Sequence, residues 1–259
     1  MSFLRWLVCT LGLLLPLATF ADAVTIGAED DASPWSYSDG SGYVNDLVRA
    51  AYKEVGWKVT YKVLPYSRCK LQTEEGKLVA CFSASKTPET EKNLQFPSMP
   101  VFVARNILLA NADSPLNGCD VDAWPHKMSV GFVNEYEYMP AVEALRKSGR
   151  IAVNMVPSEV LMLRMLANGR FDTAVITLDE VKRIELISVL ARVKPFFKEV
   201  CDYGGLPAYV AFSRAHPQAK EALAAFNKGF ALIIKNGTVE RLKKEWANKV
   251  LSKASNKPQ

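Results

Sequence analysis

The sequence has few of the residues and motifs on which catalytic and metal sites depend. It contains only two histidines, His126 and His216, among 259 residues. Neither lies in an HExxH motif or in another spacing typical of metal ligands. A GxSxG nucleophile elbow, a Walker A loop and a GxGxxG turn after a strand are also absent. We therefore expect a protein without catalytic activity, metal or cofactor.

Long apolar runs are confined to the N-terminus. Arg5 precedes an apolar run from Trp6 to Phe20, and Ala21-Asp22-Ala23 follows with small residues. This arrangement is typical of a secretory signal peptide cleaved after residue 21 or 23. The alternative is an uncleaved anchor, but the run is shorter than the roughly 20 residues that a spanning helix needs. We expect a mature protein in the periplasm.

Charge of one sign is not concentrated anywhere in the chain. The sequence has 32 lysines and arginines against 27 acidic residues, and removal of the leader with Arg5 leaves a net charge of 32 − 1 − 27 = +4. The basic residues are scattered, with no arginine-rich stripe and no interleaved aromatics. Mild basicity of this kind is weak evidence for a nucleic-acid partner, and we expect none.

Cysteine is scarce, but its number is informative. Cys9 lies inside the apolar leader, which leaves Cys69, Cys81, Cys119 and Cys201 in the mature chain. An even number of cysteines in an exported protein favours disulfides, and four cysteines permit three pairings. Zinc is the competing use of four thiols, but no CxxC pair accompanies them.

The periodicity of the first half predicts alternating strands and helices. Apolar residues on one face and a following Gly56 indicate a helix over 45–55. Alternation of strand and crossover helix implies a parallel sheet. The expected elements are strands at 24–28, 58–64 and 78–83, and helices at 45–55 and 67–75.

A second unit of the same kind begins near Lys127. Ser158 is placed to cap a helix that ends at Gly169, and Pro217 is placed in the first turn of a C-terminal helix. The expected strands are 128–133, 151–155 and 171–177; the expected helices are 141–147, 158–168, 217–235 and 238–250, with a frayed tail at 252–259. An extended stretch at 101–109 joins the two units, and a second at 203–213 leads to the C-terminal helices.

An ordered series of segments resembles the bacterial family 3 extracellular solute-binding proteins, the periplasmic receptors of polar amino acid ABC transporters. The segments cover nearly all of the mature chain, and each alone is weakly specific. They are Ser33–Tyr37, Gly42–Val48, Gly76–Cys81, Ser83–Glu89, Phe96–Val101, Val130–Phe132, Gly169–Asp172 and Phe226–Trp246.

The resemblance implies an α/β fold of the type II, Venus-flytrap class, with two lobes joined by a two-stranded hinge. Lobe 1 would comprise 24–103 and 210–250, and lobe 2 would comprise 104–209, with crossings near 102–109 and 202–209. The implied protein is a monomer that closes on a small polar solute by hinge bending. It would dock transiently on a membrane ABC permease.

The resemblance also suits one pairing of the cysteines, in which Cys69 joins Cys81 in the first lobe and Cys119 joins Cys201 beside the second. Local geometry supports the first pair, because a helix leaving Cys69 and the strand returning after Gly76 have similar lengths. A pairing across the lobes would lock the hinge.

The resemblance places Trp35 and Tyr37 where the family has a ligand-stacking aromatic, and aromatic faces suit such contacts. The alternative is that Trp35 packs beneath its loop. Ser83 and Ser85 match serines whose hydroxyls and backbone amides meet a ligand carboxylate. A simple turn is the alternative for the serines.

The chain departs from the family at two charged anchors. Thr90 occupies the position of a carboxylate-clamping arginine, and a neutral hydroxyl does not replace a bidentate guanidinium. Thr177 lies where amino acid binders carry an aspartate for the α-amino group, although Asp179 follows closely. A standard α-amino acid ligand is therefore in doubt.

Substitute anchors are available nearby. Arg68 and Lys86 are candidate cationic anchors, with a solvated surface position as the alternative. Glu135 and Tyr136, followed by Tyr138, occupy a strand-to-helix loop that would close over the ligand or face water.

Acidic residues at the end of the first strand complete the candidate site. Glu29 and Asp30 lie where open α/β sheets present groups to ligands, and they would favour a cationic or hydroxyl-bearing solute. A periplasmic dehydratase is a second function found on this fold, and it needs a general acid. Glu29, Asp30 or Glu135 would suit that role if burial raised the pKa of the carboxyl group. A soluble receptor for a sensor or chemotaxis protein is the third possibility.

Overall fold

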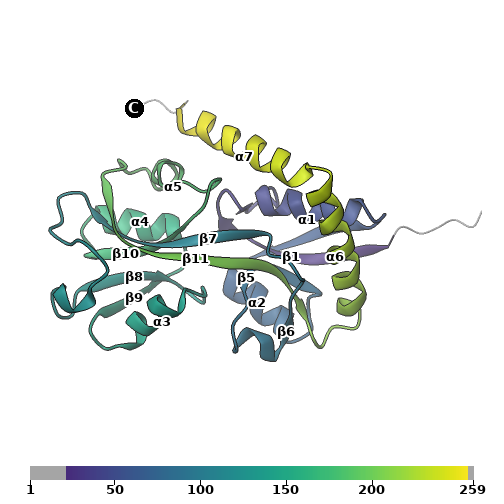
Figure 1. Ribbon diagram of the computed structural model, residues 1–259, viewed down its shortest axis with the longest axis horizontal. Helices are drawn as coiled ribbons and strands as arrows, with labels where there is room; N and C mark the ends of the chain where they lie inside the picture. Colours follow the sequence, from purple (N-terminus) through teal and green to yellow (C-terminus); the bar gives the residue numbers. More distant parts are fainter. Residues whose placement is uncertain (1–21, 256–259) are drawn as a thin grey trace, which may run out of the picture.

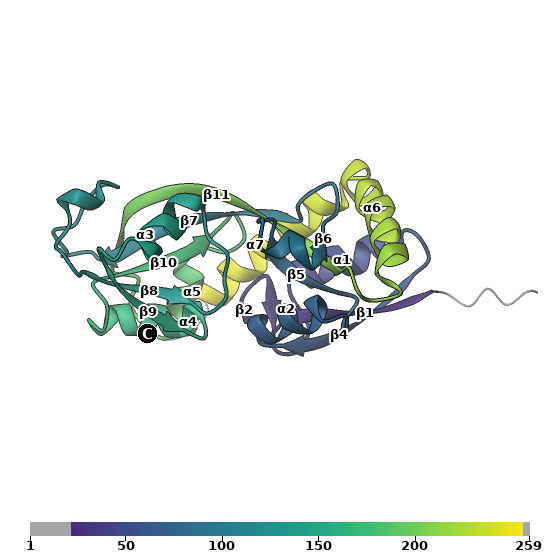
Figure 2. The same cartoon turned by 90° about the horizontal axis from the view of Figure 1, so that it is seen from below.

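The computed structural model describes residues 22–255, and the predicted signal peptide (1–21) lies outside the described residues. One nine-stranded mixed sheet runs through the molecule in the order β4-β1-β5-β11-β7-β10-β8-β9, with β6 on β11. Helices pack on both faces of each half of this sheet, which gives the two lobes seen side by side in Figures 1 and 2.

The first lobe is built from the N-terminal α/β unit and the C-terminal helices. Strand β1 pairs in parallel with β4 and β5, as the alternating pattern predicts. The buried stripe of α1 packs on α6 and α7 around Tyr52 and Phe226. The elements are β1 (Ala23–Glu29), β2 (Asp31–Ala32), β3 (Ser36–Tyr37), α1 (Tyr43–Lys53), β4 (Lys58–Leu64), α2 (Tyr66–Glu74), β5 (Ala80–Ser85), η1 (Thr90–Lys92), β6 (Leu94–Gln95), α6 (Ala219–Lys235) and α7 (Thr238–Ser255).

The second lobe repeats the arrangement, with β8 parallel to β9 and to β10. Side chains alternate across β10, so Ala174 and Ile176 join the core beneath α4 and α5, and Val175 joins the core beneath α3. The elements are η2 (Val121–Ala123), β8 (Ser129–Val133), α3 (Pro140–Lys147), β9 (Ala152–Val156), α4 (Glu159–Ala167), β10 (Thr173–Leu178) and α5 (Ile184–Ala191).

Two long antiparallel strands, β7 (Phe102–Asn111) and β11 (Phe197–Ser213), pass between the lobes. The first half of β11 pairs with β7 beside the second lobe, and its last residues pair with β5 in the first lobe. The extended stretches expected at 101–109 and 203–213 lie within these strands. The predicted two-lobed α/β fold is thus present, and the lobe boundaries remain predictions.

The sequence-based predictions hold for the main helices and strands apart from α5 and the end of α7, and the short elements β2, β3, β6, η1 and η2 were not predicted. Ser158 accepts a hydrogen bond from the Leu161 N–H, which confirms the predicted cap of α4. Helix α5 was not expected, because its residues are apolar almost all round and show no clear stripe. Helix α7 continues to Ser255, so a frayed tail from 252 is wrong for 252–255.

Both expected disulfides are present. Cys69 in α2 is bonded to Cys81 in β5, and Cys119 is bonded to Cys201 in β11. The first bond ties a helix to the adjacent strand, and the second joins the segment after β7 to its partner strand. Within residues 22–255, no helix is both long enough and apolar enough to cross a membrane.

Candidate functional site

A small cavity of about 30 Å³ lies between the lobes, beside the linking strands. This volume holds about two water molecules. Its apolar wall consists of Trp35, Phe102, Ala104, Leu206 and Ala208, and its polar lining consists of Glu29, Tyr66, Ser83, Ser85, Asn106, Tyr136, Glu137 and Thr177. An apolar wall that faces several convergent polar groups suits a small polar molecule.

Three polar atoms in this lining are buried and have no hydrogen-bond partner in the structure. They are Oε2 of Glu29 at the end of β1, Oγ of Ser83 in β5 and Nδ2 of Asn106 in β7. The Asn106 side chain is held by its other atom, Oδ1, which accepts from the Met139 N–H at 2.7 Å. Because buried polar groups are almost always paired, three such atoms around one cavity mark a place where a ligand or water completes the bonding.

A local irregularity of β5 directs Ser83 into the cavity. The register between β5 and β11 shifts here, since Tyr209 pairs with Ala84 and Val210 pairs with Phe82. Ser83 is the extra residue of this bulge and has a φ of +69°, a conformation uncommon for residues other than glycine. Bulges of this kind re-aim side chains beside functional sites.

Glu29 is the most strongly perturbed carboxyl of the cavity. Its side chain is 4 % exposed, and Tyr136 from the other lobe donates a hydrogen bond of 2.6 Å to Oε1. Desolvation by burial raises the pKa of Glu29 to about 8, although the Tyr136 hydrogen bond and the Lys182 charge oppose the shift. The carboxyl group is therefore mostly protonated at neutral pH, and a nearby cation would promote its ionisation.

Trp35 forms the apolar wall under restraint from both lobes. Its ring contacts Phe102, with ring centroids 4.2 Å apart, and the Lys182 ammonium lies 3.9 Å from its centroid. The indole N–H donates to Asp179 Oδ2 at 2.8 Å. Trp35 is therefore held in one orientation, in which its ring forms part of the cavity wall.

The second lobe holds a buried ion pair behind this wall. Lys182 is paired with Glu159, and both side chains are almost fully buried. Glu159 Oε1 also accepts hydrogen bonds from the Thr177 N–H and hydroxyl, at 2.6 and 2.7 Å. Thr177 lines the cavity, but its hydroxyl hydrogen is already committed to Glu159.

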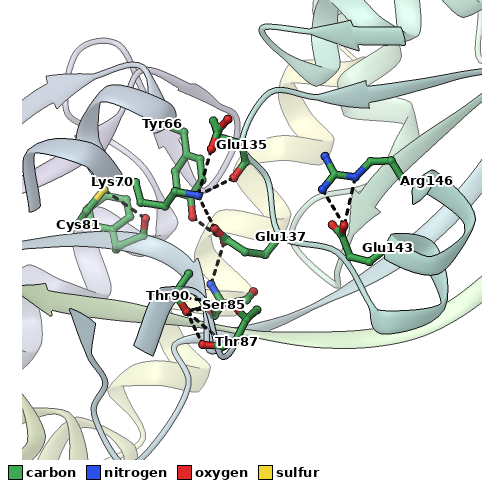
Figure 3. A network of polar contacts seen from close by, with 11 residues as sticks. Tyr66, Lys70, Cys81, Ser85, Thr87, Thr90, Glu135, Glu137, Glu143 and Arg146 are labelled. Carbon is green, nitrogen blue, oxygen red and sulfur yellow. Dashed lines mark hydrogen bonds and ion pairs between the residues drawn. The ribbon is translucent and has the colours of Figure 1, made fainter. Parts of the chain in front are cut away.

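A carboxylate from the second lobe reaches into the first lobe at the edge of the cavity (Figure 3). Glu137 Oε2 accepts from the Tyr66 hydroxyl at 2.6 Å and from the Ser85 N–H at 3.2 Å, and Oε1 accepts from Lys70 Nζ at 2.9 Å. Burial would lower the pKa of Lys70, but the charge and hydrogen bond of Glu137, together with the charges of Glu135 and Glu74, outweigh burial and raise the pKa. Glu137 thus closes the gap between the lobes.

The structure brings together about half of the residues predicted for the site. Those that line the interlobe cavity are Glu29, Trp35, Ser83, Ser85, Tyr136 and Thr177. They come from both lobes, although they are separated by as many as 148 positions in the chain (177 − 29). Their roles in binding a ligand remain predictions.

The other predicted residues lie elsewhere. Tyr37 stacks on Trp246 of α7, Arg68 is exposed, and Lys86 forms a surface ion pair with Glu91. Thr90 is turned inward and donates to the Ser85 carbonyl, so it shapes the loop after β5. Thr90 and Glu135 line a separate cavity of about 220 Å³ on the far side of Glu137.

Sequence reasoning missed Tyr66, Asn106 and Glu137. Tyr66 lies one residue before the predicted start of a helix, and Asn106 interrupts an otherwise apolar strand, a signal that could have been used. Glu137 belongs to the predicted Glu135–Tyr138 loop, but periodicity does not tell which side chain of a loop points inward. Within residues 22–255, no cluster of three or more His, Cys, Asp or Glu side chains could hold a metal ion.

Comparison with known structures agrees with this architecture. A histidine kinase sensor domain with similarity to periplasmic binding proteins has a TM-score of 0.72 and 21 % identity, covering 86 % of this chain and 95 % of that one. An ancestral arginine-binding protein has a TM-score of 0.71 and 21 % identity, covering 86 % of this chain and 97 % of that one. The ancestral amino acid-binding protein AncCDT-1, a precursor of cyclohexadienyl dehydratase, has a TM-score of 0.65 and 19 % identity. The alignment covers 86 % of this chain and 94 % of that one. At these identities the likeness concerns the fold.

No curated protein sequence matches the chain. The family model of the bacterial extracellular solute-binding proteins, family 3, matches residues 24–249, which include both lobes and both linking strands. The match agrees with the two-lobed fold. The chain therefore belongs to family 3 of the bacterial extracellular solute-binding proteins.

Proposed function

We propose that this protein is a periplasmic receptor that captures a small polar solute between its lobes and delivers it to an ABC permease. The observation that carries the proposal is the convergence of Glu29 Oε2, Ser83 Oγ and Asn106 Nδ2, buried and unpartnered, on one interlobe cavity. Leaving such atoms unpaired is costly, so a solute that bonds to them gains affinity and specificity.

Entry of a solute requires the lobes to separate. A cavity of about 30 Å³ is too small for an amino acid or amine, and cross-lobe hydrogen bonds from Tyr136 and Tyr66 close it. The two linking strands, β7 and β11, are the elements about which the lobes would turn. The closed arrangement would re-form around the solute.

A thermal-shift screen of amino acids, amines, polyamines and organic acids tests the proposal. A solute at a hundred times its Kd stabilises the folded protein by about 2.7 kcal/mol. Ser83→Ala should weaken binding of the hit at least tenfold. Thr173→Val is the matched control, because it also removes a buried, unpartnered hydroxyl but lies outside the cavity. No hit from any class would reject the function.

The position of the protein in the cell and its partner have separate tests. Mass spectrometry of the exported protein should find a new N-terminus at residue 22 or 24, as the leader pattern predicts. Crosslinking of the solute-bound protein in cells should capture a permease; capture of a membrane sensor instead would favour a receptor role.

A dehydratase function is the second candidate, and the state of Glu29 favours it. Burial raises the pKa of Glu29 to about 8, so the carboxyl carries a proton at neutral pH that it could donate to a departing hydroxyl. Release of water from a hydroxylated cyclohexadiene would be followed by ultraviolet absorbance of the aromatic product. Turnover abolished by Glu29→Gln would establish the enzyme, whereas absence of turnover with a tight thermal-shift hit would exclude it for that substrate.

A further inference from the structure

The cluster that receives the Glu137 carboxylate is a complete binding site for one carboxylate. It offers a phenol O–H from Tyr66, a backbone N–H from Ser85 and an ammonium from Lys70, all within 3.2 Å of a Glu137 oxygen (Figure 3). Charge-assisted bonds of this kind are the strongest that a carboxylate makes in proteins. Both oxygens of Glu137 are engaged, and its side chain is 10 % exposed.

The rest of the cavity offers no positive charge to a second carboxylate. The three unpartnered atoms are a carboxyl oxygen of Glu29, a hydroxyl of Ser83 and an amide nitrogen of Asn106, none of which carries positive charge. Lys182 is already committed to Glu159. A free carboxylate in this space would therefore lie near acidic groups without a cation to neutralise it.

Charge balance points the same way. Lys70 is paired with Glu137 and Lys182 is paired with Glu159, so these two pairs are neutral. Glu29 is then the remaining acidic group of the cavity lining, and its Oε2 is unpartnered. When Glu29 ionises, the site carries one net negative charge, which one cationic group would neutralise.

We propose that Glu137 is a specificity-determining residue that occupies the carboxylate position of the site, so that the solute is an organic cation without a carboxylate group. This inference rests on the proposed function and specifies the class of solute for the same cavity. The solute's ammonium or guanidinium group bonds to Glu29, and its polar remainder bonds to Ser83 and Asn106. Glu137 rejects the corresponding amino acid by filling the position that its carboxylate would need.

Pairs of compounds that differ by one carboxylate test the proposal. The probes are histamine and tyramine, each against its parent histidine or tyrosine, with Kd measured by calorimetry. In the wild-type protein, the best-bound amine should bind at least tenfold more tightly than its parent. Tighter binding of the parent amino acids would overturn the proposal, whether or not any variant folds.

Glu137→Ala frees Tyr66, Lys70 and the Ser85 N–H, so the preference for that amine over its parent should fall at least tenfold. Glu135→Ala is the matched control, because Glu135 also contacts Lys70, at 3.5 Å, but is 62 % exposed and does not line the interlobe cavity. It should leave the preference unchanged. A preference that Glu137→Ala does not alter, in a variant that melts like the wild type, would overturn the proposal.

The outcomes also separate this inference from the function on which it rests. If another class of solute binds in a manner sensitive to Ser83→Ala but none of the amines does, the inference fails and the binding function stands. If the full screen yields no solute, the binding function itself fails.

Discussion

The pH dependence of folding tests the environment of Glu29 directly. An unfolded chain ionises this carboxyl near the ordinary pKa of 4.5, whereas desolvation raises the pKa of Glu29 to about 8 in the folded protein. Between these values the folded state holds a proton that the unfolded state has released. The contribution is fully present below about pH 4.5 and is lost as the pH rises through about 8.

The size of the effect follows from the two pKa values. One group in this range lowers the free energy of unfolding by about 1.4 kcal/mol for each pH unit gained. From pH 4.5 to 8 the total is at most about 5 kcal/mol, worked from these two values. The charges and hydroxyl facing Glu29, from Tyr136, Lys182, Glu159 and Asp30, are included in the raised pKa.

Glu29→Gln isolates this contribution, because glutamine has the same shape and does not titrate in this range. Urea unfolding followed by tryptophan fluorescence at pH 5, 6, 7 and 8 yields the free energy of unfolding of each protein. The value for wild type minus that for Glu29→Gln should fall steadily as the pH rises. Glu135→Gln, at an exposed loop position, should give a flat difference.

A flat difference for Glu29→Gln as well would refute the reasoning. It would mean that Glu29 ionises in the folded protein as freely as in the unfolded chain. The carboxyl would then lie in a wide, water-filled cleft, and the closed site described above would not be the resting form of the protein.

Three further predictions concern binding and stability. Tyramine should bind more tightly as the pH rises from 6 to 8, by up to about tenfold per unit, because the cation favours ionised Glu29, whose pKa burial raises to about 8; a Kd independent of pH in calorimetry would contradict this. Replacing both Cys69 and Cys81 with serine should lower the free energy of unfolding in urea by about 3 kcal/mol, which is the loop entropy of a 12-residue separation. An unchanged unfolding midpoint would contradict this. Gly229→Ala should lower the free energy of unfolding by about 2 kcal/mol, since the new Cβ would lie 1.8 Å from a backbone oxygen of α1. The control Lys228→Ala, at an exposed neighbouring position, should change it by no more than about 0.5 kcal/mol. Equal effects of the two substitutions would disprove the close packing.

The residues of the site were predictable where a strand end points to them. Glu29 is the last residue of β1, and the ends of strands in an open α/β sheet are where ligand groups are presented. Ser83 and Ser85 lie in the second half of β5, and the family resemblance led us to expect them. Arg68 and Lys86 lie at the surface, because a charged side chain beside a strand end can reach either the cleft or the solvent. Local sequence carries no signal for that choice.

The sequence by itself determined the elements and the class of fold. Alternating strand and helix patterns are set by side-chain periodicity, which is local, so β4 was predicted to the residue and most other boundaries to within a few residues. The resemblance to the solute-binding family implied the pairing of the four cysteines, and local geometry supported the bond between Cys69 and Cys81.

Only the tertiary structure decided which groups meet across the lobes. Glu137 lies 52 residues from Ser85 and 71 from Tyr66, and nothing in the local pattern of its loop distinguishes it from Glu135. The φ of +62° at Glu135 and the packing of Tyr136 on Tyr66 set which carboxylate turns inward. Contacts between distant segments depend on how the two lobes close on each other, and that geometry is a property of the whole folded chain.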